Sequence, residues 1–191
     1  ERFSQTTWVS QDGKWDLYAK LYRNRPQPGS LHGQMLIETT VDHDMAGRFF
    51  WTRNPDARSA DFPNGFSVHD RDAIACRYAA PPTRGRNLID HALPALPDVY
   101  HNCRLVLLDT AAIPMIEKVL SWNRFNQIRY YGPNRVNVRV NPRTGLVTGG
   151  LSGIHGVTYL RNFRFGGVIL QKQEVVVGSH QDYGLFGIDV R

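Results

Sequence analysis

The sequence predicts an all-β protein, built as an antiparallel barrel or sandwich of short strands with at most one short helix. About ten runs alternate apolar and polar residues, which is the two-residue period of half-buried strands. Turn residues such as Asp12-Gly13 and Asn141-Pro142 separate the runs. Glycines also recur inside the runs, where they mark bulges, bends or a close backbone approach. These interior glycines are Gly33, Gly47, Gly149, Gly150, Gly166 and Gly167.

The first part of the chain is expected to form a lead-in over residues 1–13 and then successive strands. Trp15, Leu17 and Ala19 fall on one face of the first strand, and Tyr18 falls on the other. Prolines and polar turns separate the later runs. The predicted strands are 15–22, 30–40, 46–53, 65–69 and 73–79.

The middle of the chain is less regular. Residues 83–98 contain Gly85, Pro94 and Pro97 and predict a long loop. Residues 102–109 (NCRLVLLD) predict a strand. Residues 111–120 fit either one short helix or another strand, because Pro114 is tolerated in the first turn of a helix but not in its interior.

Residues 130–191 predict an antiparallel meander of five strands. Val136, Val138 and Val140 alternate with Asn137 and Arg139, as in a half-buried strand. The segment NPRTG over residues 141–145 has the composition of a tight turn. Strands are expected at 136–140, 146–151, 163–170, 175–177 and 184–190.

Length and composition predict one globular domain over residues 1–191. A chain of 191 residues can bury a sizeable core. Its hydrophobic content of 41% and charged content of 21% are ordinary for a folded protein. No apolar run approaches the ~20 residues of a membrane helix, so no membrane span is predicted. Neither a GxGxxG nor a GxxxxGK[ST] loop occurs, and no cofactor is predicted.

The chain is basic, with a formal net charge of +6 and four lysines among its 23 basic residues. The charge is dispersed, without a block of five or six like charges, so nucleic acid is not favoured as a partner. Arginines and aromatic residues nevertheless interleave between Trp122 and Arg135. Because β-barrels bind single-stranded nucleic acid through such residues, a nucleic-acid-binding barrel remains a second alternative.

Two cysteines, Cys76 and Cys103, each lie in a predicted strand. Neither belongs to a CxxC pair or another metal-binding spacing. If the two strands are neighbours, a disulfide between them fits the geometry of such bonds, and two buried thiols fit the sequence equally well.

Three clusters of histidine and aspartate are candidate metal or catalytic sites. They are Asp42-His43-Asp44, His69-Asp70 with Asp72, and Asp90-His91. Consecutive strand residues point to opposite faces, so Asp42-His43-Asp44 cannot supply all three ligands to one ion without a loop. No HExxH, EF-hand or GxSxG spacing is present, and solvated turns are favoured. No catalytic or metal-binding residue is therefore predicted, and the chain is expected not to be an enzyme.

Ligand-binding residues are expected among exposed aromatic side chains. Planar aromatic rings on an open face stack against sugar rings, while polar neighbours bond the hydroxyl groups. Trp15 and Trp51 fall on the apolar sides of their strands. The predicted ligand-binding residues therefore lie beside a loop in the second half of the chain, and they are Trp122, Arg124, Tyr130 and Tyr131. They make a carbohydrate-binding module the first alternative function.

Segments spread over residues 12–190 carry a recognisable pattern, including DGKWDLYAKLY, GSLHGQMLIET, AGRFFWTRNP, FPNGF and FRFGGVILQKQ. This pattern resembles a β-rich module that recurs in large secreted and cell-surface proteins of environmental bacteria, beside kelch-like, β-propeller or immunoglobulin-like repeats. The matching residues are Leu17, Tyr22, Leu31, Gly33, Gly47, Trp51, Pro63, Gly65, Phe66, Gly145, Gly149, Phe165, Gly167, Val168, Leu170, Gln171 and Lys172. The resemblance is weaker over 83–101 and 179–191.

The resemblance implies an extracellular or cell-envelope location and no catalytic residues. Together with the residue patterns, it predicts a non-enzymatic structural or adhesive module that docks into a larger surface protein or assembly. The expected partners are other protein chains or domains, or a glycan, contacted through strand edges and aromatic loops.

Overall fold

A computed structural model describes residues 5–58, 62–81, 101–109, 111–123, 125–155, 158–180 and 185–190. The chain divides into two compact units, Glu1–Cys76 and Arg77–Arg191. Each unit carries one antiparallel β-sheet, so the predicted all-β class is confirmed. The predicted single domain over residues 1–191 stays a prediction beside this division. The described residues contain no helix with the length and hydropathy of a membrane span.

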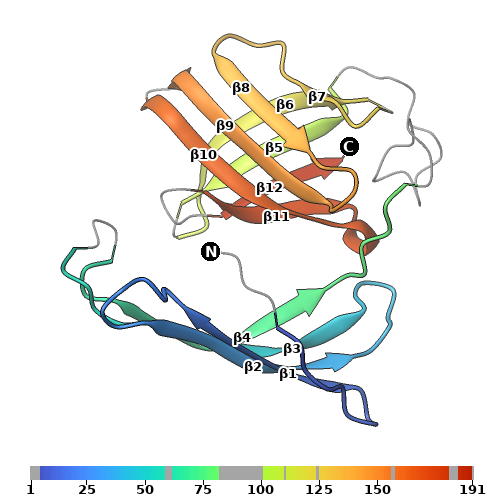
Figure 1. Ribbon diagram of the computed structural model, residues 1–191. Helices are drawn as coiled ribbons and strands as arrows, with labels where there is room; N and C mark the ends of the chain where they lie inside the picture. Colours follow the sequence, from blue (N-terminus) through green and yellow to red (C-terminus); the bar gives the residue numbers. More distant parts are fainter. Residues whose placement is uncertain are drawn as a thin grey trace. The chain divides into compact units, whose positions relative to one another are not determined.

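The first unit is an open sheet of four strands in sequence order (Figure 1). Its strands are β1 (Lys14–Leu21), β2 (Gly29–Ile37), β3 (Met45–Arg53) and β4 (Phe66–Ala75). The side chains of Ala19, Leu21 and Met35 are buried on one face of this sheet, whereas Tyr18 is 60% exposed on the other. The faces predicted for the first strand are therefore confirmed.

The two strands predicted at 65–69 and 73–79 are one strand, β4, and this part of the prediction was wrong. Asp70 takes a φ of 53°, and the pairing with β3 shifts register between Phe49 and Trp51. The irregularity is a β-bulge, which inserts an extra residue without ending the ladder. Sequence reasoning mistook the polar residues at the bulge for a turn.

The outer edge of β1 is partly covered by the segment before it. The side-chain amide of Gln5 donates to the carbonyl oxygen of Asp16 at 3.0 Å and accepts from the backbone N–H of Tyr18 at 2.8 Å. Val9 forms a single bridge with Trp15. These contacts occupy backbone groups that would otherwise be available to another chain.

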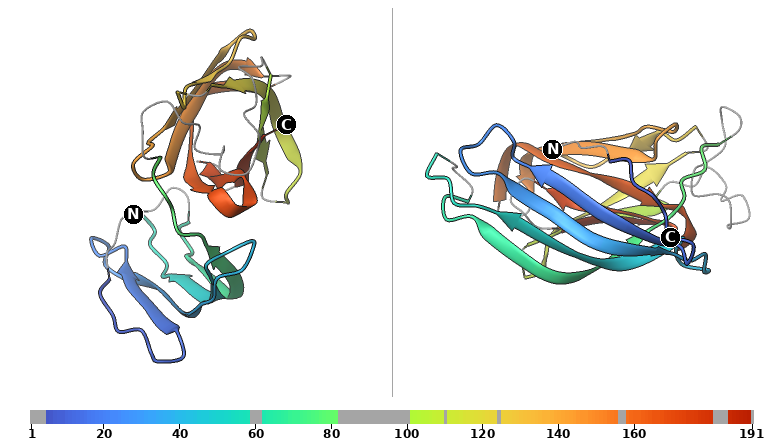
Figure 2. Two further views of the ribbon diagram at one scale, coloured as in Figure 1. Left: turned by 90° about the vertical axis from the view of Figure 1, so that its right-hand side faces the viewer. Right: turned by 60° about the horizontal axis from the view of Figure 1, so that its bottom comes forward.

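The second unit is a closed barrel of eight antiparallel strands (Figure 2). Neighbouring strands follow the sequence order, and β12 pairs with β5 to close the ring. The strands are β5 (Cys103–Leu108), β6 (Pro114–Trp122), β7 (Ile128–Arg129), β8 (Arg135–Val140), β9 (Leu146–His155), β10 (Thr158–Leu170), β11 (Val175–His180) and β12 (Leu185–Val190).

The predicted C-terminal meander is confirmed as β8 to β12. Of the two alternatives for residues 111–120, the strand is the observed one, since β6 begins at Pro114. Pro114 lacks an N–H and is tolerated at the first position of a strand. The short helix in the described residues is instead a 3-10 turn, η1 (Gln171–Gln173).

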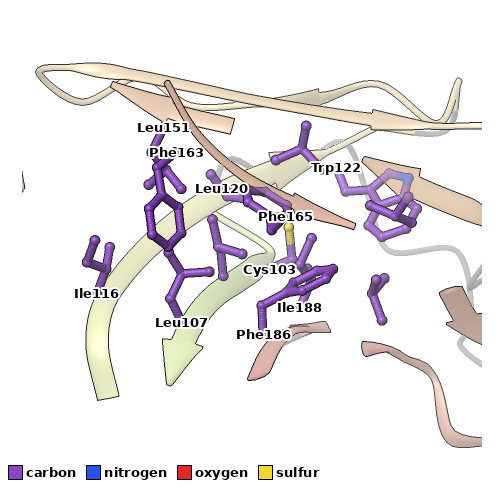
Figure 3. Close-up of a cluster of buried hydrophobic side chains, with 14 of the residues drawn as sticks. Cys103, Leu107, Ile116, Leu120, Trp122, Leu151, Phe163, Phe165, Phe186 and Ile188 are labelled. Atoms are coloured by element: carbon purple, nitrogen blue, oxygen red, sulfur yellow. The ribbon is translucent and has the colours of Figure 1, made fainter. Parts of the chain in front are cut away.

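Apolar side chains fill the barrel interior (Figure 3). Along β5, β6 and β8 they alternate with more exposed residues. Phe163, Leu105 and Leu120 are among the largest side chains that are almost fully buried. A Cβ atom at Gly149 would lie 2.1 Å from the Phe165 ring. The predicted structural role of this strand glycine is thus confirmed, because its missing side chain makes room for the ring.

The segment that leads into the barrel unit is fixed to the barrel by side chains. The Tyr78 hydroxyl donates to the carbonyl oxygen of Pro142 at 2.7 Å. The Gln171 amide donates to the Ala79 carbonyl oxygen at 2.8 Å and accepts from the Ala79 N–H at 2.7 Å. The ring of Tyr78 also packs against the core cluster. The chain therefore enters this unit at a defined position.

Candidate functional site

A groove of about 820 Å³ lies on the outer surface of the barrel, across β8, β9 and β10. Its size falls within the range of ligand sites in proteins. We call it the arginine groove. The residues that line it are Arg135, Val136, Asn137, Arg139, Thr148, Gly149, Gly150, Leu151, Ser152, Asn162, Phe163 and Arg164.

The alternation of β8 supplies one wall of the groove. Val138 points into the core and is 6% exposed, whereas Arg135, Asn137 and Arg139 are exposed on the outside. Side chains two residues apart share a face, so these three stand in one line along the strand. Arg135 and Arg139 are four residues apart, so they are separated by roughly 13 Å along the backbone.

The floor and the opposite wall come from β9 and β10. Gly150 pairs with Asn137 on one side and with Arg164 on the other. Because Gly150 has no side chain, the centre of the groove is left open between the two walls. In β10 a register shift lies between Leu160 and Phe163, and Asn162 takes a φ of 54° at this bulge. The bulge adds a residue to the strand beside the groove.

The groove carries three positive charges and no negative one, because none of its lining residues is Asp or Glu. Among the residues that the structure describes, neither Arg135 nor Arg139 takes part in an ion pair. Arginine binds carboxylate, sulfate or phosphate groups through its planar fork of N–H donors. Side chains of Asn137, Thr148 and Ser152 add neutral hydrogen-bonding groups. The arrangement suits an anion that also carries hydroxyl groups.

The predicted ligand-binding residues do not form a common surface. The expectation that Trp122 is exposed was wrong: its side chain is 2% exposed in the barrel core (Figure 3). Trp122 continues the inward alternation of Ile116 and Leu120 along β6, a signal that was present in the sequence. Its backbone N–H and carbonyl oxygen both bond the side chain of buried Asn102, at 2.7 and 2.8 Å.

The other three predicted ligand-binding residues have different environments. Tyr130 is partly buried and packs against the core cluster, so its ring is not an open platform. Tyr131 is 56% exposed, as expected. Arg124 lies outside the described residues. The sequence prediction missed the arginine groove, although the alternation in β8 already placed Asn137 and Arg139 on its polar side.

The disulfide alternative for the cysteines was wrong. Cys103 is fully buried inside the barrel, and Cys76 lies in the other unit. The thiol of Cys76 donates to the carbonyl oxygen of Asp42 at 3.5 Å. Burial, with a smaller contribution from the charge of Asp189, raises the pKa of the Cys103 thiol to about 12. Cys103 lies on the inward-facing side of β5, so its sulfur points into the barrel core and not toward a second cysteine.

The histidine–aspartate clusters have structural partners in the open sheet. Thr40 Oγ1 lies 3.1 Å from Nδ1 of His43 and accepts from the His43 backbone N–H, which closes a turn. Arg48 on β3 bonds Asp70 at 2.6 Å and Asp72 at 3.2 Å. Asp90-His91 falls outside the described residues. Within the described residues, no group of three or more His, Cys, Asp or Glu could hold a metal ion.

Comparison of the chain with protein-family models, with curated proteins and with solved structures gave no match.

Proposed function

We propose that this chain is a non-enzymatic adhesive module of a secreted or cell-surface protein, and that the arginine groove binds an acidic polysaccharide. The observation that carries the proposal is a concave surface with three arginines and no acidic residue. Such a surface concentrates anions at its mouth, and the effect weakens with salt.

The chemistry of the groove favours binding over catalysis. Its lining residues include no imidazole, thiol or carboxylate that could act as a general base for a reaction. The guanidinium groups would hold carboxylate or sulfate groups, and the amide and hydroxyl side chains would bond the sugar hydroxyls. A polymer with repeated charges fits better than a single small anion, because the arginines are spread along and across the strands.

An acidic polysaccharide fits the groove better than single-stranded nucleic acid does. Proteins that bind single strands combine positive charge with aromatic rings on which bases stack. Phe163 is the one aromatic residue among those lining the groove, and it is 1% exposed. The groove therefore offers a nucleic acid positive charge but no exposed aromatic ring on which its bases could stack.

The proposed location rests on the resemblance of the sequence to a module of secreted and cell-surface bacterial proteins. Docking into a larger assembly, the other part of the predicted function, stays a prediction. Light scattering of the purified chain at several concentrations and salt levels would test it, because assembly through apolar contacts gives an oligomer that persists in salt.

The binding proposal can be tested by calorimetric titration with polygalacturonate oligomers at low and physiological salt. Neutral dextran and a single-stranded DNA of similar charge serve as comparison ligands. Replacing Arg135 and Arg139 together by glutamine should weaken polygalacturonate binding by about tenfold or more, because two charge-assisted contacts are removed. The variant with Arg129 and Arg143 both replaced by glutamine is the matched control, since it also removes two positive charges, from exposed positions outside the groove.

Equal weakening by the groove variant and by the variant with Arg129 and Arg143 replaced would show that only net charge matters, and would overturn the proposal. Absence of polygalacturonate binding would do the same. Tighter binding of the single-stranded DNA than of polygalacturonate would replace it with the nucleic-acid alternative.

A further inference from the structure

The polar face of the four-stranded sheet carries three parallel rows of side chains that run across all four strands. We call it the row face; it is the face opposite buried Ala19 and Met35. The pairing registers align one residue from each strand in the first and third rows, and in the second row the ring contact of Phe50 with His69 continues the alignment across the bulge. The first row is Asp16, Gln34, Arg48 and Asp72; the second is Tyr18, His32, Phe50 and His69; the third is Lys20, Ser30, Thr52 and Ser67.

The middle row is aromatic over the full width of the sheet. His32 and Phe50 are stacked with ring centroids 5.2 Å apart and planes 9° apart. Phe50 and His69 meet edge to face at 6.1 Å. Tyr18 stands at the β1 end of the row, and its side chain is 60% exposed. With strands about 4.8 Å apart, the row presents a band roughly 14 Å long.

The two flanking rows consist of hydrogen-bonding side chains, and several of them are positioned by bonds to neighbouring side chains. Gln34 donates to Asp16 at 2.9 Å, and Arg48 donates to Asp72 at 3.2 Å. On the other side, the Ser67 hydroxyl lies 2.8 Å from Nε2 of His69. Donors and acceptors that are fixed before a ligand arrives reduce the entropy lost on binding.

The charges of the row face nearly cancel. Lys20 and Arg48 stand against Asp16, Asp70 and Asp72, and the contacts of Arg48 to Asp70 and Asp72 pair the central charges. A charged polymer would therefore gain little here. An uncharged ligand with apolar faces and many hydroxyl groups matches the alternation of an aromatic row between two polar rows.

The aromatic row is not needed for the core of the sheet. Apolar burial in this unit is supplied by the opposite face, where Ala19, Leu21 and Met35 are 5–7% exposed. Stacking between neighbouring strands stabilises the sheet through His32 and Phe50. Tyr18, however, adds a large aromatic side chain to the row at an exposed position, where contact with solvent would favour a polar residue.

We propose that the row face is a second binding site, which takes an uncharged polysaccharide lying across the four strands. Pyranose rings contact the aromatic row, with Tyr18 as the exposed contact, and hydroxyl groups bond the flanking rows. This site differs from the arginine groove in its unit, its ligand charge and its contact residues, so either site can exist without the other. A chain with both would bind two kinds of glycan.

The test is titration of the full chain with cellohexaose, xylohexaose and mannohexaose, followed by calorimetry and by NMR chemical-shift changes. At least one hexasaccharide is expected to bind, with shift changes on β1 and β2. Tyr18→Ala should weaken this binding by about tenfold, because an aromatic contact is lost. Gln34→Ala should also weaken it while leaving every ring of the row in place.

Two controls separate this site from other effects. Leu36→Ala removes an exposed apolar side chain from the same face outside the three rows, and it should leave the affinity unchanged. The groove variant with Arg135 and Arg139 replaced by glutamine should also bind the hexasaccharide unchanged. The proposal is overturned if none of the three sugars binds, or if Tyr18→Ala and Gln34→Ala both keep the full affinity.

Discussion

Arg104 and Asp189 lie opposite each other across the seam that closes the barrel. They are register partners on β5 and β12, 85 residues apart in the chain. Nε and Nη2 of Arg104 donate to the two carboxylate oxygens of Asp189 at 3.3 and 3.2 Å. This ion pair raises the pKa of Arg104 and joins the first and last strands of the barrel.

Replacing Asp189 with asparagine should destabilise the barrel only slightly. The effect is small because the two side chains are 33% and 40% exposed, and solvent screens the pair. Urea unfolding followed by circular dichroism measures the change. Glu117→Gln is the control, since Glu117 lies farther from Arg104, at 3.7 Å. A larger loss in Glu117→Gln than in Asp189→Asn would contradict the assignment.

Gly149→Ala should destabilise the barrel by about 1–3 kcal/mol, because the new methyl group collides with the Phe165 ring. The free energy of unfolding in urea is the measurement. Phe165→Leu in the same chain should recover part of the loss by vacating the space. Gly187→Ala is the matched control, as the nearest atom to its added Cβ is 3.5 Å away. Equal costs for the two alanine variants would refute this packing argument.

Cys103 should resist thiol reagents in the folded protein. Its side chain is fully buried and its pKa is raised to about 12, so it carries almost no thiolate at pH 8. Ellman's reagent should therefore react with one thiol per chain, that of partly exposed Cys76. In denaturing urea both thiols should react. Mass-spectrometric detection of rapid native labelling at Cys103 would count against the buried position.

The open sheet should lose stability in acid, because the carboxylate of Asp56 becomes protonated. The backbone N–H of Arg58 donates to its carboxylate at 3.0 Å, and together with the nearby guanidinium groups of Arg58 and Arg25 it lowers the pKa of Asp56 below 3.8. A lowered folded-state pKa gives stability that is present above the unfolded value and is lost as the pH falls through the folded value.

The measurement for Asp56 is thermal unfolding of the native chain and of Asp56→Asn between pH 7 and pH 2. The native chain should be the more stable at pH 7, and the difference should shrink below pH 4. A difference that stays constant down to pH 2 would mean that the ionised carboxylate does not provide the stabilisation.

Part of the arginine groove could be predicted from the sequence. The alternation of Val136, Val138 and Val140 already placed Asn137 and Arg139 outward, and Arg135 has the same parity. The other wall could not be predicted, because Arg164 joins it only through the pairing of β10 with β9. That pairing includes a bulge, and its register cannot be derived from either strand alone.

The wrong prediction for Trp122 arose because the strand that contains it was predicted to end too early. Trp122 was predicted at the surface because the preceding element was predicted to end at residue 120. Its parity with Ile116 and Leu120 places it in the barrel core instead. The row face was also missed, although Tyr18 was predicted on the polar side of its strand. The alignment of Tyr18 with His32 and Phe50 depends on the registers of two strand pairs.

The sequence by itself determined the all-β class, most strand positions and the face on which each side chain of β1 and β8 lies. These depend on local properties: a period of two residues and the turn preferences of glycine, proline and asparagine. Tertiary structure alone decided that β1 to β4 form an open sheet, that β12 closes a barrel on β5, and that distant residues meet in the arginine groove and on the row face. The physical reason is that backbone hydrogen bonds between strands are non-local, and they set the register that brings side chains from different strands together.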